Sequence, residues 1–261
     1  MNLSEVENKS LGLVLSGGGV KGMAHIGVIQ ALNEFGLKAH TISGSSVGAL
    51  IGALYANNNS VSDMLTFFKE TPLFRYNFMT ILKPGLIDTE RYFELFLKYF
   101  PEDSFEKLHR KLHVITTDLQ KGDQRVFSQG ELILPLLASA ALPPVFSPVE
   151  IEGQLYADGG IMNNFPYDEV VGETNFIIGS NVSGINQIGK EGIKSSLQLA
   201  NRTTALMIYA TNREKINKCD LIFEPRELEQ IGVLDKKGIE KAYDIGYEHA
   251  VMKIRDRFIN R

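Results

Sequence analysis

The chain has 261 residues, of which 44% are apolar and 22% are charged, and its formal net charge is −4. This composition is that of a globular protein with a sizeable core, and the length suits one large α/β domain or two small ones. The acidic balance and the lack of any basic run exclude nucleic acid as a partner, because nucleic-acid binding depends on clustered Lys and Arg. The single cysteine, Cys219, excludes an intrachain disulfide and a cysteine-based metal site.

The beginning of the chain, MNLSEVENKS, is polar and acidic, and we expect residues 1–10 to form an N-terminal tail. This segment lacks the basic-then-apolar layout of a secretory signal. No stretch approaches the roughly eighteen apolar residues that a membrane-spanning helix needs. We therefore expect a cytoplasmic protein, and attachment to the periphery of a membrane stays open.

The first sixty residues alternate strand and helix patterns. Residues 11–16 (LGLVLS) are apolar almost without a break, as in a buried parallel strand, and a glycine-rich turn and the helix MAHIGVIQALNEFG follow. A second strand at 39–45 leads into Ser46 and a helix of small residues at 47–58. This order predicts an α/β fold, a three-layer sandwich with helices covering a mostly parallel central sheet.

The rest of the chain continues the same alternation. We expect strands at 113–119, 153–160, 175–182 and 219–225, and helices at 61–70, 89–100, 131–141, 195–217 and 236–258. The sequence contains no repeat, low-complexity tract or Pro/Gly/Ser linker. We therefore expect one domain over 11–261, in which the helical, aromatic-rich residues 61–110 could form a cap.

The glycine-rich turn GGGVKG, residues 17–22, has two functional interpretations. It fits the dinucleotide pattern GxGxxG, but the second strand ends in ISGSS without the acidic residue that would hold a ribose. A P-loop is excluded because no Gly-Lys-Ser/Thr follows. Alternatively, its backbone N–H groups at a helix start could bind the negative oxygen of a reacting ester. Lys21 could add positive potential there or simply be a solvated side chain.

The segment GSSVG, residues 44–48, has the Gly-x-Ser-x-Gly spacing of a serine nucleophile on a sharp strand-to-helix turn. A serine needs a base to take its proton. In an α/β-hydrolase the chain order would make His249 the base, but the pattern around it is helical. His25 is one turn into the first helix and could touch the site. Neither these two histidines nor His40, His109 and His113 supply a convincing base.

A carboxylate is the better candidate for the base. Asp158 ends a predicted strand in YADGGIMNN and is followed by Gly159 and Gly160. Because the carboxyl ends of parallel strands share one edge of a sheet, Asp158 could meet Ser46 and the glycine-rich turn there. Taken alone, Asp-Gly-Gly could also be a simple turn. Burial of Asp158 would raise its pKa from about 4 and make it a stronger base.

The motifs SGGGVKG, GSSVG and DGG, in this order, resemble the three signatures of the patatin-like phospholipase family. The stretches LASAALPPVFSPVEIEGQLYADGGIMNNFP and ITTDLQKGDQRVF resemble further family segments, so the resemblance covers at least 11–167. It implies hydrolysis of lipid acyl esters by a Ser-Asp dyad, Ser46 as nucleophile and Asp158 as base, without a metal or other cofactor. It also implies an oxyanion loop and two glycine-flanked turns, made of Gly17, Gly18, Gly19, Lys21, Gly22, Gly44, Gly48, Gly159 and Gly160.

Residues 67–105 are rich in aromatic side chains, which could pack in the core or form a cap that lines an acyl-chain pocket or touches a bilayer. Two functions follow from the whole sequence. The first is a serine acyl hydrolase acting on phospholipid or lysophospholipid esters. The alternative is a lipid- or acyl-binding regulatory protein with little turnover. The pattern predicts neither head group, chain length nor oligomeric state. The aromatic residues are Phe67, Phe68, Phe74, Tyr76, Phe78, Tyr92, Phe93, Phe96, Tyr99, Phe100 and Phe105.

Overall fold

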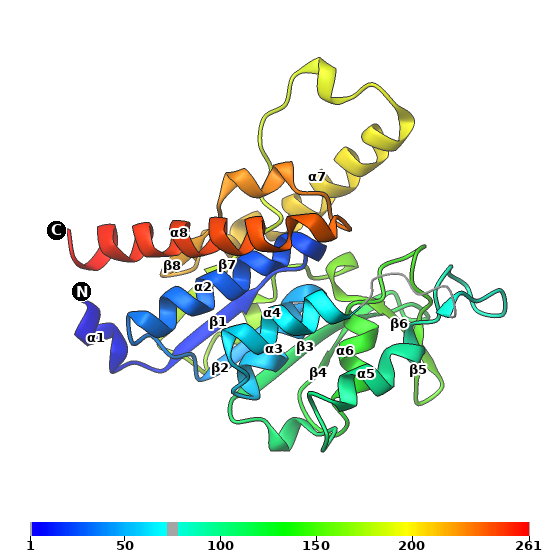
Figure 1. Ribbon diagram of the computed structural model, residues 1–261, viewed down its shortest axis with the longest axis horizontal. Coiled ribbons are helices and arrows are strands. Elements are labelled where there is room, and N and C mark those ends of the chain that lie inside the picture. Colours follow the sequence, from blue (N-terminus) through cyan, green and yellow to red (C-terminus); the bar gives the residue numbers. More distant parts are fainter. Residues whose placement is uncertain (1, 72–77, 261) are drawn as a thin grey trace.

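A computed structural model describes residues 2–71 and 78–260, which build an eight-stranded sheet flanked by helices (Figure 1). The strand order is β5-β6-β3-β2-β1-β7-β8, and β4 pairs with β3 outside this path. The strands are β1 (Leu11–Leu15), β2 (Thr41–Ser45), β3 (Lys111–Asp118), β4 (Asp123–Phe127), β5 (Val149–Ile151), β6 (Gln154–Asp158), β7 (Phe176–Ser180) and β8 (Leu221–Phe223). The helices are α1 (Leu3–Glu7), α2 (Met23–Glu34), α3 (Val47–Ala56), α4 (Val61–Glu70), α5 (Phe93–Leu97), α6 (Ile133–Ser139), α7 (Ser196–Ile216) and α8 (Ile239–Phe258).

The sheet is mostly parallel, and its two faces are covered separately. Strands β1, β2, β3, β7 and β8 run parallel to their neighbours in this group. Leu13 and Leu15 of β1 belong to the large core that includes α2 and α3, whereas Val14 packs with Phe165 and Ile216 on the other face. This alternation follows from the strand period of two and confirms the expected α/β fold.

Helices α2 and α8 lie against each other along one side of the sheet (Figure 1). A Cβ added at Gly27 would lie 2.2 Å from the carbonyl oxygen of Tyr243, and one at Gly246 would lie 2.2 Å from that of Ala24. The two helix backbones therefore touch where these glycines meet.

The described aromatic residues of 67–105 lie mainly in the core. Phe67 is buried and packs edge-to-face against Phe68, Phe96 and Tyr99. Phe74 and Tyr76 lie outside the described residues. The remaining buried rings in this stretch are Phe78, Tyr92, Phe100 and Phe105.

Several elements differ from the expected ones. The helix expected over 89–100 is a 3₁₀ turn at Thr89–Tyr92 followed by the short α5. The tail expected at 1–10 contains α1, which a capping box between Asn2 and Glu5 stabilises. Strand β4 was not expected, because its sequence is largely polar and its side chains are half-buried or exposed. Among residues 2–71 and 78–260, no helix has both the length and the apolar character to cross a membrane.

Candidate active site

Ser46 stands on a strained turn between β2 and α3. Its backbone has φ 54° and ψ −128°, which side-chain-bearing residues rarely adopt and which costs on the order of 1–3 kcal/mol. The flanking glycines permit the turn, since a Cβ at Gly44 would lie 2.5 Å from the Gly48 carbonyl oxygen and one at Gly48 would lie 2.3 Å from that of Leu15. The Gly-x-Ser-x-Gly spacing thus lets α3 fold back onto β1 and β2.

Strands β2 and β6 meet end to end along one edge of β3. Strand β2 pairs with Lys111–Ile115 of β3 and β6 pairs with Thr116–Asp118, while β4 occupies the opposite edge over Val114–Asp118. The carboxyl ends of β2 and β6 therefore point toward each other. The sequence suggested that Asp158 ends a parallel strand, but β6 runs antiparallel to β3. Asp158 meets Ser46 because the antiparallel β6 uses the part of β3 that extends beyond β2.

The two side chains at this meeting point share a buried hydrogen bond. Ser46 Oγ donates to Asp158 Oδ2 at 2.6 Å, and the second carboxylate oxygen, Oδ1, accepts from the backbone N–H of Gly160 at 2.7 Å. Asp158 is only 3% exposed and Ser46 is 9% exposed. Burial raises the pKa of Asp158 to about 6, although both hydrogen bonds oppose this shift.

The turn after Asp158 is closely packed. A Cβ at Gly159 would lie 2.2 Å from the Ile115 carbonyl oxygen, and one at Gly160 would lie 2.6 Å from Asn164 Oδ1. The peptide N–H of Asp158 donates to the Ala141 carbonyl at 3.1 Å, and Thr117 Oγ1 donates to the Asp158 carbonyl at 2.9 Å. Backbone and side chain of Asp158 are therefore both fixed.

A buried serine that the sequence did not indicate binds the backbone of the turn at residues 44–48, which we call the elbow. Ser139, the last residue of α6, accepts a hydrogen bond from the Ser46 N–H at 2.9 Å and is fully buried. The one available sequence signal was a serine in an otherwise apolar helix, ILPLLAS. It carries no information about a partner 93 residues away.

The glycine-rich loop lies directly against Ser46. A Cβ at Gly17 would lie 3.1 Å from Ser46 Cβ, and one at Gly22 would lie 2.4 Å from Val47 Cγ1. Gly19 has φ +59°, and a Cβ there would lie 2.2 Å from the Val233 carbonyl oxygen. The loop therefore has no room for side chains at these positions.

The ends of the loop are fixed by hydrogen bonds to distant parts of the chain. Gly17 N–H donates to the Asn164 carbonyl at 3.2 Å, and Val20 N–H donates to the Val233 carbonyl at 2.8 Å. Between them, the N–H groups of Gly18 and Gly19 donate no hydrogen bond to any residue of the described ranges. They can therefore bind an oxygen of a ligand.

His25 supports this loop and does not contact the Ser46 hydroxyl. Its Nε2 lies 2.9 Å from the Ser16 carbonyl oxygen and its Nδ1 lies 2.7 Å from Ser180 Oγ. Because a carbonyl only accepts, Nε2 carries the proton and Nδ1 accepts from Ser180. Burial lowers the pKa of His25 to about 4, so the ring is neutral near pH 7.

Two of the remaining histidines make contacts remote from Ser46. His40 Nδ1 accepts from the Leu11 N–H at the start of β1, and His113 lies 3.5 Å from Glu173. His249 belongs to α8.

Burial lowers the pKa of Lys21 in the glycine-rich loop, and Glu229 opposes this shift. Among the residues that the structure describes, no three His, Cys, Asp or Glu side chains gather as a metal site would require.

Comparisons with known proteins bear on the family to which the chain belongs. A family model of patatin-like phospholipases matches residues 13–171. An uncharacterized NTE family protein of Mycobacterium tuberculosis is 32% identical over 175 residues, which is 65% of this chain and 30% of that protein. Patatin-like phospholipase domain-containing protein 6 of Mus musculus is 33% identical over 172 residues, which is 61% of this chain and 12% of that protein. The chain thus spans less than a third of the length of each of these two relatives.

The fold also has a counterpart among solved structures. The crystal structure of VipD from Legionella pneumophila superposes with a TM-score of 0.56 over 96% of this chain and 67% of that one, at 16% identity. This likeness supports the fold alone. The family is shown by the family model, which covers more than half of the residues: the chain belongs to the patatin-like phospholipase family.

Proposed function

We propose that the protein is a serine acyl hydrolase of lipid carboxylic esters, with phospholipids or lysophospholipids as substrates. Ser46 is the nucleophile, Asp158 is the base, and the loop from Gly17 to Gly22 binds the oxyanion. The observation that carries this proposal is the buried hydrogen bond of 2.6 Å between Ser46 Oγ and Asp158 Oδ2 on a strained elbow. Family membership supports lipid esters as the substrate class.

In the first step, Ser46 Oγ attacks the ester carbonyl carbon and its proton passes to Asp158 Oδ2. The carbonyl oxygen becomes negative, and the N–H groups of Gly18 and Gly19 stabilise it. The tetrahedral intermediate then collapses, the bond to the alcohol breaks, and Asp158 returns the proton to the leaving alcohol oxygen. The products of this step are the free alcohol and an acyl-Ser46 ester.

In the second step, a water molecule replaces the alcohol and the same groups act again. Asp158 takes one proton of the water as its oxygen attacks the acyl carbon. Collapse of the second intermediate releases the fatty acid and returns the proton to Ser46 Oγ. With a pKa of about 6, Asp158 is ionised near pH 7 and is still a stronger base than a carboxylate in water.

We also propose that residues 11–261 act as one patatin-like domain. The sheet includes strands from Leu11 to Phe223, and α8 packs on α2, which supports this division.

Cell fractionation would test the expected cytoplasmic or membrane-peripheral location.

Labelling with a fluorophosphonate tests the proposal, because this probe reacts with activated serines. We expect modification of Ser46 and hydrolysis of phospholipid or lysophospholipid, both absent in Ser46→Ala. Ser128→Ala, at an exposed serine, is the matched control and should behave like the parent protein. Lipid binding without labelling or hydrolysis would instead support the alternative, a lipid-binding regulatory protein.

A further inference from the structure

The loop of residues 78–88 places large apolar side chains in solvent. Ile81 is 99% exposed and Leu82 is 93% exposed, and Met79 and Leu86 beside them are more than half exposed. We name these four residues the apolar tip. Single exposed apolar residues are common in globular proteins, but four within eight positions form a patch that implies a partner.

The backbone of this loop is fixed at its base. Met79 and Ile87 form an antiparallel bridge, and Thr80 N–H donates to the Leu86 carbonyl at 3.1 Å. The N–H groups of Leu86 and Ile87 both donate to the Val145 carbonyl at 3.0 Å. The loop is therefore a closed turn attached to the segment that follows α6.

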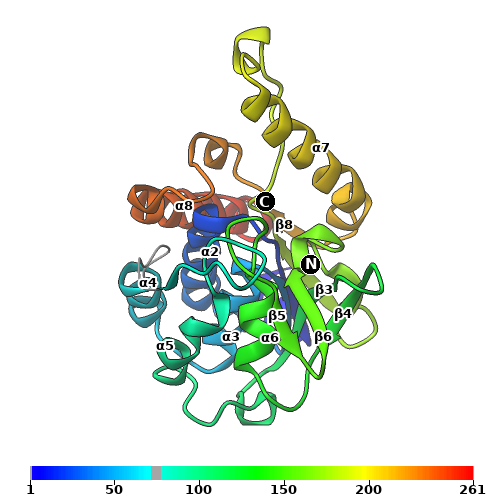
Figure 2. The same ribbon diagram turned by 90° about the vertical axis from the view of Figure 1, so that its right-hand side faces the viewer.

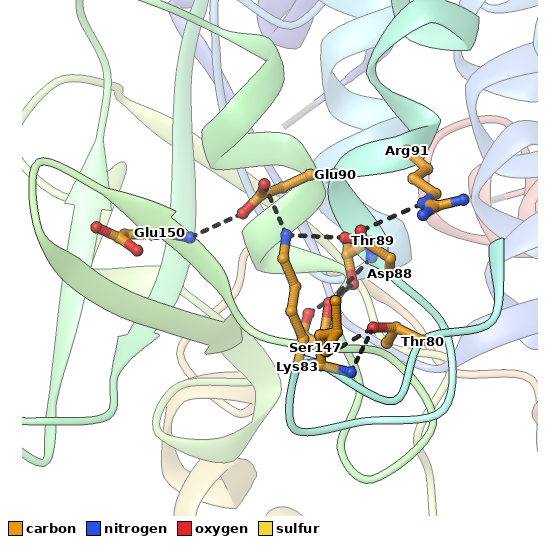
Figure 3. A network of polar contacts seen from close by, with 9 residues as sticks. Thr80, Lys83, Asp88, Thr89, Glu90, Arg91, Ser147 and Glu150 are labelled. Carbon is orange, nitrogen blue, oxygen red and sulfur yellow. Dashed lines mark hydrogen bonds and ion pairs between the residues drawn. The ribbon is translucent and has the colours of Figure 1, made fainter.

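Polar contacts complete the base of the loop (Figure 3). Lys83 Nζ lies 2.9 Å from Asp88 Oδ1 and 2.8 Å from Glu90 Oε2, and Glu90 also accepts from the Glu150 N–H at 3.3 Å. Thr80 Oγ1 accepts from the N–H groups of Leu82 and Lys83 at 3.2 and 3.3 Å. The charge of Lys83 is thus compensated, and the N–H groups of Leu82 and Lys83 have a hydrogen-bond acceptor within the loop.

The apolar tip lies at the same end of the molecule as Ser46. In Figure 1 the loop projects at the right-hand edge, toward which β1 and β2 run, and Figure 2 shows it from that end. The chain connects the two places directly: Ser139 holds the Ser46 N–H, and Val145, six residues later, holds the base of the loop. The apolar tip therefore lies beyond the end of the sheet at which the glycine-rich loop and Ser46 follow β1 and β2 (Figure 1).

We propose that the apolar tip docks this protein onto a lipid bilayer by inserting Ile81 and Leu82 among the acyl chains. The inference rests on the proposed function for the choice of lipid as the partner. The charged groups at the base are three carboxylates, Asp88, Glu90 and Glu150, against Lys83 and Arg91, so they do not attract an anionic surface. Docking is apolar and independent of lipid charge, and it brings ester bonds to Ser46.

The test measures vesicle binding apart from turnover. Ser46→Ala protein is sedimented with phosphatidylcholine vesicles, with and without the further changes Ile81→Asp and Leu82→Asp. The matched control is Val171→Asp, at a half-exposed apolar residue just before β7, at the opposite end of the sheet. We expect the tip variant to bind on the order of tenfold more weakly or worse, since buried apolar area drives insertion, while Val171→Asp binds as the parent does.

Binding should also be unchanged between about 0.1 and 1 M NaCl and between zwitterionic and anionic vesicles, because salt screens only electrostatic attraction. In a Ser46 background, the tip variant should lose hydrolysis of vesicle lipid and keep that of a water-soluble short-chain ester. If the protein with Ser46 and the unchanged tip hydrolyses neither substrate, the proposed function is overturned and the result for vesicle binding is unaffected. The docking proposal is overturned if the parent binds no vesicle, binds only anionic vesicles at low salt, or binds equally well with the tip changed. It is also overturned if the tip variant alters only the oligomeric state.

Discussion

The surroundings of Ser46 and the 78–88 loop depart from the usual distribution of side chains in opposite directions. Around Ser46, polar groups are buried: Asp158, His25 and Ser139 are at most 3% exposed, and each has a hydrogen-bond partner. In the 78–88 loop, Ile81 and Leu82 are almost wholly in solvent. Both regions are hydrogen-bonded to the end of α6 or the segment just after it, through Ser139 and Val145.

Each departure costs free energy of folding that ordinary packing would avoid. A buried carboxylate loses hydration, and an exposed aliphatic side chain forgoes burial. On the functions proposed above, the two costs have separate purposes: the first serves chemistry at Ser46 and the second serves contact with a lipid bilayer. Changes in the first region should therefore alter turnover, and changes in the second should leave turnover of soluble esters unaltered.

The largest expected effect comes from removing the dyad. Ser46→Ala and Asp158→Asn should each lower turnover on the order of 10⁴- to 10⁶-fold, and the double variant should be scarcely worse than either one. The losses do not add because nucleophile and base act in the same proton-coupled step. Steady-state hydrolysis of a soluble ester measures this, with Ser128→Ala as control. Losses that multiply in the double variant would show that the two residues act independently.

A smaller effect is expected from the loop. Gly19→Ala should lower turnover on the order of 10²- to 10³-fold, because the new methyl would meet the Val233 carbonyl and displace the neighbouring N–H groups. Gly122→Ala is the matched control: its φ is also positive, +71°, but a Cβ there meets nothing within 4 Å. Equal kinetics of the two variants would argue against an oxyanion role for the loop.

Asp158→Asn should raise the free energy of unfolding although it lowers turnover. Its pKa is about 6 when folded and about 4 when unfolded, so the folded state binds its proton more tightly, and stability falls as pH rises from about 4 to about 6. Asp158→Asn removes this cost and should raise the free energy of unfolding at pH 8 by on the order of 2 kcal/mol. Urea unfolding at pH 8 and pH 5 measures the gain, which should shrink at the lower pH. A destabilised variant at pH 8 would contradict the assigned cost of burial.

The same pKa predicts the pH dependence of turnover. Because the base must be ionised, kcat/KM should rise about tenfold per pH unit below about 6 and level off above it. A pH profile with a soluble ester and the free enzyme measures this. A midpoint near 4 would mean that Asp158 is not desolvated in the working enzyme.

The smallest effects are expected from the histidines. Replacement of His40 or His113 by Gln should leave turnover within about tenfold, a barrier change near 1.4 kcal/mol, since their contacts lie away from Ser46. For His25→Gln we expect the same, because a Gln amide can still donate to the Ser16 carbonyl. A folded histidine variant as inactive as Ser46→Ala would mean that the base is a histidine and that the dyad assignment is wrong.

The sequence predicted β1 and β7 well because both strands are buried along their whole length and carry mostly apolar side chains. It missed β4 because an edge strand with exposed polar side chains lacks that pattern. The structure brings Ser46 and Asp158 together as expected, while their catalytic roles stay predictions. They do not meet at a shared edge of parallel strands, as the sequence predicted, because β6 is antiparallel to β3 and strand direction is decided by distant pairing. Ser139 and the tip at Ile81 and Leu82 likewise depend on three-dimensional neighbours that spacing does not encode.

The end-to-end meeting of β2 and β6 also determines when, during synthesis, the site can exist. Ser46 leaves the ribosome 112 residues before Asp158, and the glycine-rich loop is held by Asn164 and then by Val233, which are made later still. A nascent chain thus carries its serine without a base and its loop without supports. The proposed active site can therefore form only after Asp158, Asn164 and Val233 have been made.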